Sequence, residues 1–205
     1  YPQLLEIDST VFTHVNCFGA NDGAIQAIQY IGGTPPYEFS VDGGPLQSYM
    51  AFTGIGPGQH TVEILDSNNC GAQDIIFIDE PTQMHVEMHA SNWNNYQIQC
   101  HGDTSGYVDI NASGATAPYY INSVSFNDSI TVGNYFAGVY TFLVHDSNGC
   151  EYEETITFNE PSPIGHNFNV NHVLCRNNGS IIDSIYGGVG SATTYTYLWN
   201  TGETT

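Results

Sequence analysis

Five cysteines carry the most reactive side chains of this 205-residue chain. A cysteine sulfur can act as a nucleophile, bind a metal or form a disulfide. No Cys-x-x-Cys spacing occurs, which disfavours a zinc site. The scattered positions favour disulfides instead, and structural disulfides indicate an oxidising compartment. The five residues are Cys17, Cys70, Cys100, Cys150 and Cys175.

An alternating trio, His85, Glu87 and His89, is the clearest candidate for a metal site. On a strand these residues share one face at steps of roughly 7 Å, and two imidazoles with a carboxylate can bind a transition metal. The same alternation is typical of a solvated strand face whose Met and Val neighbours point into the core. We favour that structural interpretation. No equivalent trio occurs elsewhere in the chain, so even a real metal site would be local.

Clusters of acidic residues are candidates for structural calcium, a hard cation that prefers oxygen ligands. The chain has no EF-hand or RTX spacing, so solvated carboxylates are the more frequent outcome. Calcium is therefore expected at most as a structural counterion, and no other cofactor is predicted. The clusters comprise Asp22, Asp79, Glu80, Glu151, Glu153 and Glu154.

Two similar polar segments, 66–68 and 146–149, read Asp-Ser-Asn and Asp-Ser-Asn-Gly. They offer oxygen ligands, but their simpler role is a hairpin turn. In such a turn the Asp side chain caps backbone amides, and an Asn or Gly takes a positive φ. The sequence therefore predicts two tight turns rather than two cation sites.

Three aromatic residues, Trp93, Tyr96 and Tyr135, are candidates for stacking on a sugar ring. Trp93 lies in an Asn-rich segment, residues 92–95, that lengthens the start of the second half of the chain. Packing inside the protein is the more frequent fate of such rings. Sugar stacking by Trp93 and Tyr96 is the alternative.

No segment carries the pattern of a catalytic site. A nucleophile elbow, a glycine loop for phosphate and a distinct pair of catalytic carboxylates are all absent from the sequence. We therefore expect no enzymatic activity.

The charge balance excludes two classes of partner. One basic residue, Arg176, stands against 21 Asp and Glu, for a formal net charge of −20. Such a surface repels the phosphates of nucleic acids and anionic lipid headgroups. No run approaches the ~18 apolar residues of a membrane span, so direct membrane insertion is not expected. Stability must come from apolar burial, backbone hydrogen bonds and cross-links.

The sequence repeats with a period of about 80 residues. The closing cysteines of two copies are offset by 150 − 70 = 80, and a third copy opens at Cys175 but is incomplete at Thr205. We predict repeats at 1–81, 82–161 and 162–205, in an array that continues in both directions. The matching segments are Asp66–Cys70 with Asp146–Cys150, Glu80-Pro81 with Glu160-Pro161, and Cys17-Phe18-Gly19 with Cys100-His101-Gly102.

Each repeat is predicted to be all-β. Short runs rich in Ile, Val, Tyr and Phe alternate with turns of Gly, Pro, Asp and Asn, and no helical period occurs. Strand signals spaced roughly 8 to 12 residues apart favour a β-sandwich. Glu80-Pro81 leads directly into the next predicted strand at Met84, and so short a linker predicts a stiff array.

The predicted strand order suggests which cysteines pair. Cys17 precedes one strand and Cys70 follows another, with three chain reversals between them if residues 46–55 form a single strand. An odd number of reversals returns the chain to the end that it left. We therefore predict a Cys17–Cys70 bridge, worth about 4 kcal/mol in the loop-entropy account.

The second repeat is expected to follow the same scheme, with a Cys100–Cys150 bridge. Cys175 would then pair beyond Thr205. The alternative joins neighbouring repeats through Cys70–Cys100 and Cys150–Cys175 bridges.

With these features in place, the chain resembles the SprB-type repeat of gliding-motility and gliding-associated surface adhesins of the Bacteroidota. The resemblance covers nearly the whole chain. The second repeat departs from it, with Ser105-Gly106 in place of Asp-Gly and Gly114–Ala117 in place of a double glycine and proline. The motifs that carry it are Cys17–Ile25, Gly32–Tyr37, Gly58–Val62, Asp66–Cys70, Glu80-Pro81, and Tyr195–Trp199 followed by Gly202.

The resemblance implies tandem Ig-like β-sandwich modules in a very large protein, exported by the type IX secretion system and displayed at the cell surface. It implies no catalytic residues. We expect a rigid, disulfide-stapled spacer for attachment or gliding, with surface polysaccharide or other copies of the chain as partners. The alternatives are a subunit of an extracellular filament and an array of carbohydrate-binding modules.

Three Asp-Ser/Thr-methyl motifs resemble the short O-glycosylation signal of exported Bacteroidota proteins. They place candidate glycosylation sites at Ser9, Ser129 and Ser184.

Overall fold

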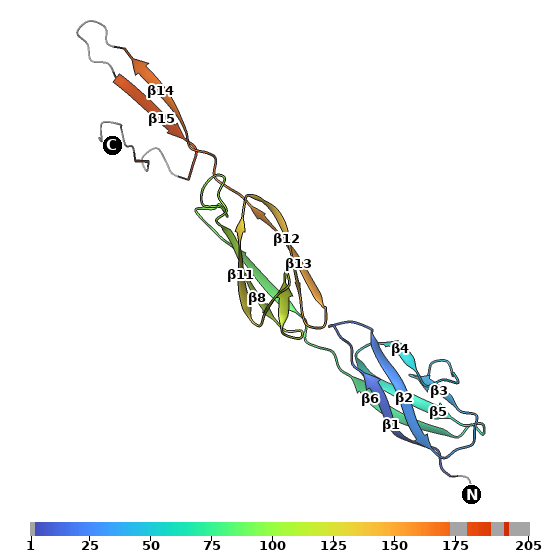
Figure 1. The fold of residues 1–205 in the computed structure, drawn as a ribbon. Coiled ribbons are helices and arrows are strands. Elements are labelled where there is room, and N and C mark those ends of the chain that lie inside the picture. Colours follow the sequence, from blue (N-terminus) through green and yellow to red (C-terminus); the bar gives the residue numbers. More distant parts are fainter. Residues whose placement is uncertain (1–2, 173–179, 190–194, 197–205) are drawn as a thin grey trace. The chain divides into compact units, whose positions relative to one another are not determined.

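The computed structural model describes residues 3–172, 180–189 and 195–196. Within these residues every regular element is a β-strand, and neighbouring strands pair antiparallel (Figure 1). The fold is all-β and consists of tandem Ig-like sandwich modules, which confirms the predicted fold class.

Six strands follow one another in the first repeat, and each predicted strand run coincides with one of them to within a few residues. They form two three-stranded sheets, with the orders β1-β2-β4 and β3-β5-β6. The bounds are β1 (Glu6–Thr13), β2 (Gly23–Ile31), β3 (Glu38–Val41), β4 (Phe52–Ile55), β5 (Gly58–Leu65) and β6 (Gly71–Ile78).

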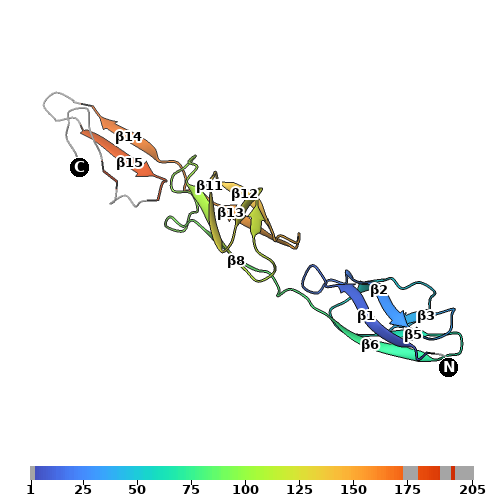
Figure 2. The same ribbon diagram turned by 60° about the horizontal axis from the view of Figure 1, so that its bottom comes forward.

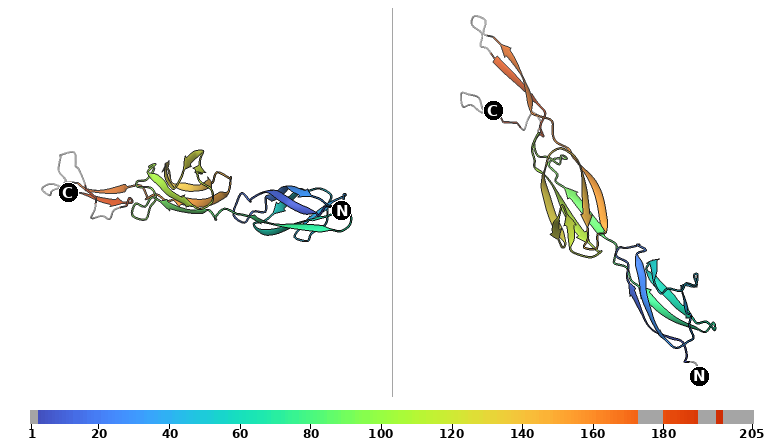
Figure 3. Two further views of the ribbon diagram at one scale, coloured as in Figure 1. Left: turned by 90° about the horizontal axis from the view of Figure 1, so that it is seen from below. Right: turned by 45° about the vertical axis from the view of Figure 1, so that its right-hand side comes forward.

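The second repeat contributes seven strands in two sheets, with the orders β11-β8-β7 and β10-β9-β12-β13. The third contributes the hairpin of β14 and β15, which runs from the Gly165–Tyr186 pair to the Asn171–Ser180 pair (Figures 2 and 3). The bounds are β7 (His85–Ala90), β8 (Gly106–Ser113), β9 (Tyr119–Ile121), β10 (Val124–Phe126), β11 (Ser129–Tyr135), β12 (Gly138–His145), β13 (Glu151–Phe158), β14 (Gly165–Asn171) and β15 (Ser180–Tyr186).

The chain divides into two compact units, each assembled from segments that are separate in the sequence. The repeat limits at 1–81, 82–161 and 162–205 describe the period of the sequence, and they stay a prediction. The first unit comprises Tyr1–Val86, Ala112–Asp128 and Val144–Tyr152, and the second comprises Glu87–Asn111, Ser129–Leu143 and Glu153–Thr205.

A hydrophobic core in the first unit draws on both of the sheets of the first repeat. On β5 the side chains of Val62 and Ile64 are fully buried, whereas those of Thr61 and Glu63 reach solvent. This period of two is what a strand with one buried face requires. The core comprises Leu5, Val15, Ile25, Ile28, Phe39, Ile55, Val62, Ile64, Ile76 and Ile78.

Aromatic rings pack in the interior of the second unit. Tyr135 stacks on the buried Phe158 at a centroid distance of 5.3 Å and meets Phe142 edge-on at 5.4 Å. Gly106 begins β8 here because a Cβ atom would lie 2.8 Å from both Ile98 Cδ1 and Phe158 Cδ1. Burial raises the pKa of the Tyr135 hydroxyl. The half-buried Tyr135 ring therefore packs against the aromatic interior of this unit, and stacking on a sugar stays a prediction.

Residues 46–55 do not form a single strand, and this overturns the premise of the predicted disulfides. Gln47 exchanges two backbone hydrogen bonds with Phe39 of β3, at 2.8 and 2.9 Å. The chain then reverses, and Phe52–Ile55 pairs with β2 as β4. Four reversals rather than three therefore separate the start of β2 from the end of β5.

Candidate functional site

A disulfide joins Cys17 to Cys150, with a Cα–Cα distance of 5.7 Å. The bond connects the cysteine that opens the first repeat to the cysteine that closes the second. Both residues belong to the first compact unit. Cys70 and Cys100 are exposed free thiols. We call the segments Asn16–Ala20 and Asp146–Cys150, with this bond, the Cys17–Cys150 junction.

The predicted Cys17–Cys70 bridge is wrong because the two sulfurs lie at opposite ends of β6. Cys70 adjoins Gly71, where β6 begins. The Cys17 loop is held beyond the other end, where the Gly19 amide donates to Glu80 Oε2 at 2.8 Å. Eight strand residues separate these ends by roughly 24 Å, far beyond the reach of a disulfide.

The predicted Cys100–Cys150 bridge is wrong for the same reason. Cys150 adjoins the start of β13, whereas the Gly102 amide donates to Glu160 Oε2 beyond the end of that strand. The alternative Cys70–Cys100 bridge is also contradicted, since both thiols are free. The alternative Cys150–Cys175 bridge fails because Cys150 is already bonded. Cys175 itself lies outside the described residues.

A buried aspartate shapes the turn that carries Cys150. The Asp146 carboxylate accepts hydrogen bonds from the amides of Asn148 at 2.9 Å, Cys150 at 2.8 Å and Thr116 at 3.0 Å. Gly149 completes the turn with a φ of 84°. This confirms the predicted hairpin turn, in which an Asp caps backbone amides.

The Cys70 turn is built in the same way. Asp66 accepts hydrogen bonds from the amides of Asn68, Cys70 and Thr34, and Asn69 has a φ of 60°. The bond from the Cys70 amide is the main reason why the pKa of Asp66 lies below its usual value. In both turns the backbone amide of the cysteine itself therefore donates to the Asp carboxylate.

Hydrogen bonds to acidic side chains shape the Cys17 loop. The backbone amide and side-chain amide of Asn16 donate to Asp22 at 3.0 and 2.7 Å, which lowers the pKa of that carboxyl. Gly19 donates to Glu80 from a φ of 70°, and Ala20 donates to the Cys17 carbonyl. Two of the predicted calcium ligands, Asp22 and Glu80, thus organise the loop as hydrogen-bond acceptors.

Direct hydrogen bonds accompany the disulfide. Asn148 Nδ2 donates to the Asn16 carbonyl at 3.0 Å and to Thr116 Oγ1 at 3.0 Å. A cavity of about 440 Å³ lies beside the bond. It is lined by Cys17, Phe18, Thr82, Gln83, Met84, Ala115, Gly149, Cys150, Glu151 and Tyr152.

A second recurring contact lies next to this cavity, and sequence reasoning missed it. The Ala115 amide donates to the Thr82 carbonyl at 2.8 Å, and Tyr119 donates through its hydroxyl to the Gly114 carbonyl. The first repeat makes the same pair of bonds with its Gly32–Tyr37 segment. A Gly-x-x-x-x-Tyr spacing common to both repeats is the signal that points to this contact.

Comparison with known families supports the interpretation of the cysteine and glycine motifs. Residues 9–46 match the family model of the SprB repeat. The chain carries a SprB-type repeat. The SprB repeat is a structural repeat of cell-surface, adhesin-like proteins and is not known to be catalytic. A search of curated proteins finds no match. The described residues include no helix that is long and apolar enough to cross a membrane.

The histidine trio lies on β7 as expected. His85, Glu87 and His89 are exposed and alternate with the more buried Val86 and Met88. Across the described residues, however, no three His, Cys, Asp or Glu side chains gather as a metal site requires. The geometry gives the proposed metal site no support. Among the other acidic candidates, Asp79, Glu151 and Glu153 lie exposed at the surface and Glu154 is half-buried.

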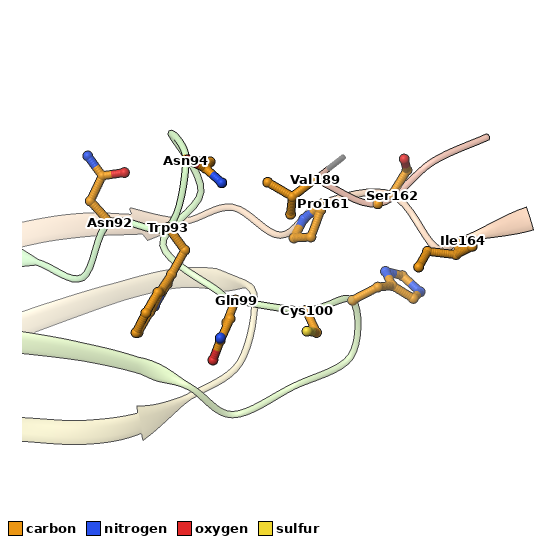
Figure 4. A pocket seen from close by; sticks show the side chains of 11 residues that line it. Asn92, Trp93, Asn94, Gln99, Cys100, Pro161, Ser162, Ile164 and Val189 are labelled. Atoms are coloured by element: carbon orange, nitrogen blue, oxygen red, sulfur yellow. The ribbon is translucent and has the colours of Figure 1, made fainter. Parts of the chain in front are cut away.

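Trp93 and Tyr96 form a small two-residue bridge beside a cavity of the second unit. Their backbones exchange hydrogen bonds at 2.6 and 3.1 Å. Trp93 is 37% exposed and, with Gln99 and Cys100, lines a cavity of about 520 Å³ (Figure 4). Tyr96 is half-buried.

The candidate glycosylation sites all reach solvent. Ser9 on β1, Ser129 at the start of β11 and Ser184 on β15 are exposed. Glycosylation at these positions stays a prediction.

Proposed function

We propose that this chain is part of a secreted cell-surface protein in which SprB-type repeats act as a covalently stapled spacer. The single observation that carries the proposal is the Cys17–Cys150 disulfide, which links the opening cysteine of one repeat to the closing cysteine of the next. A bond between two repeats limits the motion of one repeat relative to the next, whereas a bond within a single repeat does not.

Two further features support a spacer. Only six residues separate the end of β6 at Ile78 from the start of β7 at His85. The Asn148–Asn16 hydrogen bond adds a specific polar contact next to the disulfide. Short connections and extra contacts both reduce the freedom between neighbouring repeats.

Attachment to surfaces or gliding is the role we assign to the parent protein, with type IX secretion as the export route. Surface polysaccharide and other copies of the chain are the proposed partners, and calcium is the proposed counterion for the −20 charge. The acidic surface disfavours nucleic acids and anionic lipids as partners, because both carry negative charge.

A comparison of the oxidised chain with the Cys17→Ser/Cys150→Ser double variant tests the spacer. Small-angle X-ray scattering should show a broader distribution of maximum dimensions for the variant, and urea unfolding should show a loss of about 3–5 kcal/mol. Cys70→Ser is the matched control, because it removes a cysteine that bridges nothing in this structure. Identical scattering from the oxidised chain and the double variant would contradict a stapled spacer.

A further inference from the structure

The loop that carries the free thiol of Cys100 is a second copy of the Cys17 loop. In each loop an amide three residues on donates to the cysteine carbonyl, at 3.0 Å in the first and 3.1 Å in the second. The glycine two residues after each cysteine has a positive φ, 70° at Gly19 and 74° at Gly102. Each glycine donates to a glutamate, Glu80 or Glu160.

The two loops also face equivalent cavities. The cavity beside Cys100 has about 520 Å³, and the one beside Cys17 has about 440 Å³. At the Cys17 cavity, the turn from Gly149 to Tyr152 supplies the remaining wall and the bonded sulfur. At the Cys100 cavity, no such turn is present among the described residues. The equivalent wall positions are Cys17 and Cys100, Phe18 and His101, Thr82 and Ser162, Met84 and Ile164, and Ala115 and Gly188.

The third repeat makes the same glycine–tyrosine contact that lies next to the cysteine-bearing turn in the second repeat. The Gly188 amide donates to the Ser162 carbonyl at 2.8 Å, as Ala115 donates to Thr82 in the second repeat. The Tyr195 hydroxyl donates to the Gly187 carbonyl, as Tyr119 does to Gly114. In the second repeat the next residue, Thr116, donates from its amide to Asp146 of the cysteine-bearing turn. Beside Cys100 the third repeat therefore makes the same two contacts that adjoin the cysteine-bearing turn at the Cys17 cavity.

We propose that Cys100 forms a disulfide with the cysteine of the turn that closes the repeat beginning at Ser162, a turn of the Asp-Ser-Asn-Gly-Cys type. Every opening cysteine would then pair with the closing cysteine of the following repeat, and Cys70 would be the partner of an opening cysteine in a preceding repeat. This inference rests on the proposed function, because it extends the Cys17–Cys150 junction along the array.

Bond formation balances by thiol–disulfide exchange. The Cys100 thiolate attacks a small disulfide such as oxidised glutathione and releases one glutathione thiolate. The closing cysteine then attacks the mixed disulfide, which forms the protein bond and releases the second glutathione. Two protein thiols are oxidised, and one glutathione disulfide is reduced.

The test completes the third repeat with sequence from the second. A copy of residues 130–161 is added after Thr205, which supplies a closing cysteine, and the protein is refolded with oxidised glutathione. Non-reducing peptide mapping should find Cys100 bonded to the added cysteine, and alkylation of Cys100 should fall at least about tenfold. The same extension with serine in place of the added cysteine is the control.

Each outcome decides a separate claim. The inference fails if Cys100 stays reactive, or bonds to Cys70 or Cys175, while the Cys17–Cys150 bond forms. Absence of the Cys17–Cys150 bond itself would instead refute the proposed function. If the natural occupant of the Cys100 cavity is a sugar rather than the cysteine-bearing turn, Cys100 will stay reactive in the extended chain, and the inference fails.

A second measurement uses the chain without the extension, so it still tests the inference if the extended chain does not fold. A synthetic peptide of residues 144–152, activated as a mixed disulfide on its cysteine, is offered to both exposed thiols. Cys100 should react about tenfold faster than Cys70, since Cys100, unlike Cys70, lies in the loop type that receives this turn in the structure. Equal rates at the two thiols would overturn the inference.

Discussion

At the scale of single residues, two aspartates determine where the closing cysteines are presented. Asp66 and Asp146 each accept three backbone amide hydrogen bonds and lie almost completely buried. These carboxylates are the acceptors that the fold supplies for the amides of each turn. The position of Cys150 relative to Cys17 therefore depends on a carboxylate that holds the backbone amide of Cys150.

Replacement of Asp146 by alanine should destabilise the protein by about 2–3 kcal/mol, because three backbone amides lose the buried side chain that accepts their hydrogen bonds. Urea unfolding of the oxidised chain measures this loss. Asp8→Ala removes the same charge from an exposed position on β1 and should change the stability by less than about 0.5 kcal/mol. Equal effects of the two substitutions would show that the turn does not depend on the carboxylate.

Asp66 predicts an acid-sensitive turn. Its pKa is lowered in the folded state, chiefly by the hydrogen bond from the Cys70 amide, from an ordinary value of 3.8. A lowered pKa stabilises the fold above that ordinary value, and the contribution is lost as the pH falls through the folded-state pKa. Urea unfolding from pH 2 to pH 6 should therefore show a smaller acid-side loss for Asp66→Asn than for the unchanged chain.

At the scale of strands and turns, sequence reasoning succeeds where the signal is local. The Asp-Ser-Asn turns and the strand runs are specified by side chains close in sequence, and the structure places them as predicted. The pairing of Gln47 with Phe39 is a backbone contact between residues with no distinctive pattern. Because the sequence analysis missed this one chain reversal, it placed Cys70 at the opposite end of the sheet from where it lies. The predicted Cys17–Cys70 disulfide was therefore wrong.

The glycine of the recurring glycine–tyrosine contact should tolerate no side chain. At Gly114, with a φ of 75°, a Cβ would lie 2.1 Å from the Gln83 carbonyl oxygen, so Gly114→Ala must displace backbone. We expect a loss above about 2 kcal/mol in urea unfolding. At Gly43 the φ is 69° and no atom lies within 4 Å, so Gly43→Ala should cost only about 1 kcal/mol.

At the scale of the whole molecule, charge and cross-links set the conditions in which the chain is stable. A net charge of −20 with one basic side chain leaves carboxylate repulsion almost unrelieved by ion pairs within the chain. The composition predicts this directly. The linkage of one repeat to the next is not predictable from composition, since it depends on which ends of two sheets meet.

Dissolved salt should therefore stabilise the protein. The melting temperature should rise from low to high NaCl, and rise further with Ca²⁺ at equal ionic strength if carboxylates bind it. Differential scanning calorimetry at fixed pH measures both effects. A melting temperature that does not change with NaCl would contradict the role assigned to carboxylate repulsion.

The sequence separation of 133 between Cys17 and Cys150 has a mechanical consequence. If the chain is pulled from its two ends, tension crosses from one sulfur to the other, and the intervening backbone carries none of it. At about 3.4 Å per residue, roughly 450 Å of contour length stays hidden until the bond is reduced. The reach of the loaded chain is then governed by the reductant around it rather than by the strength of its sheets.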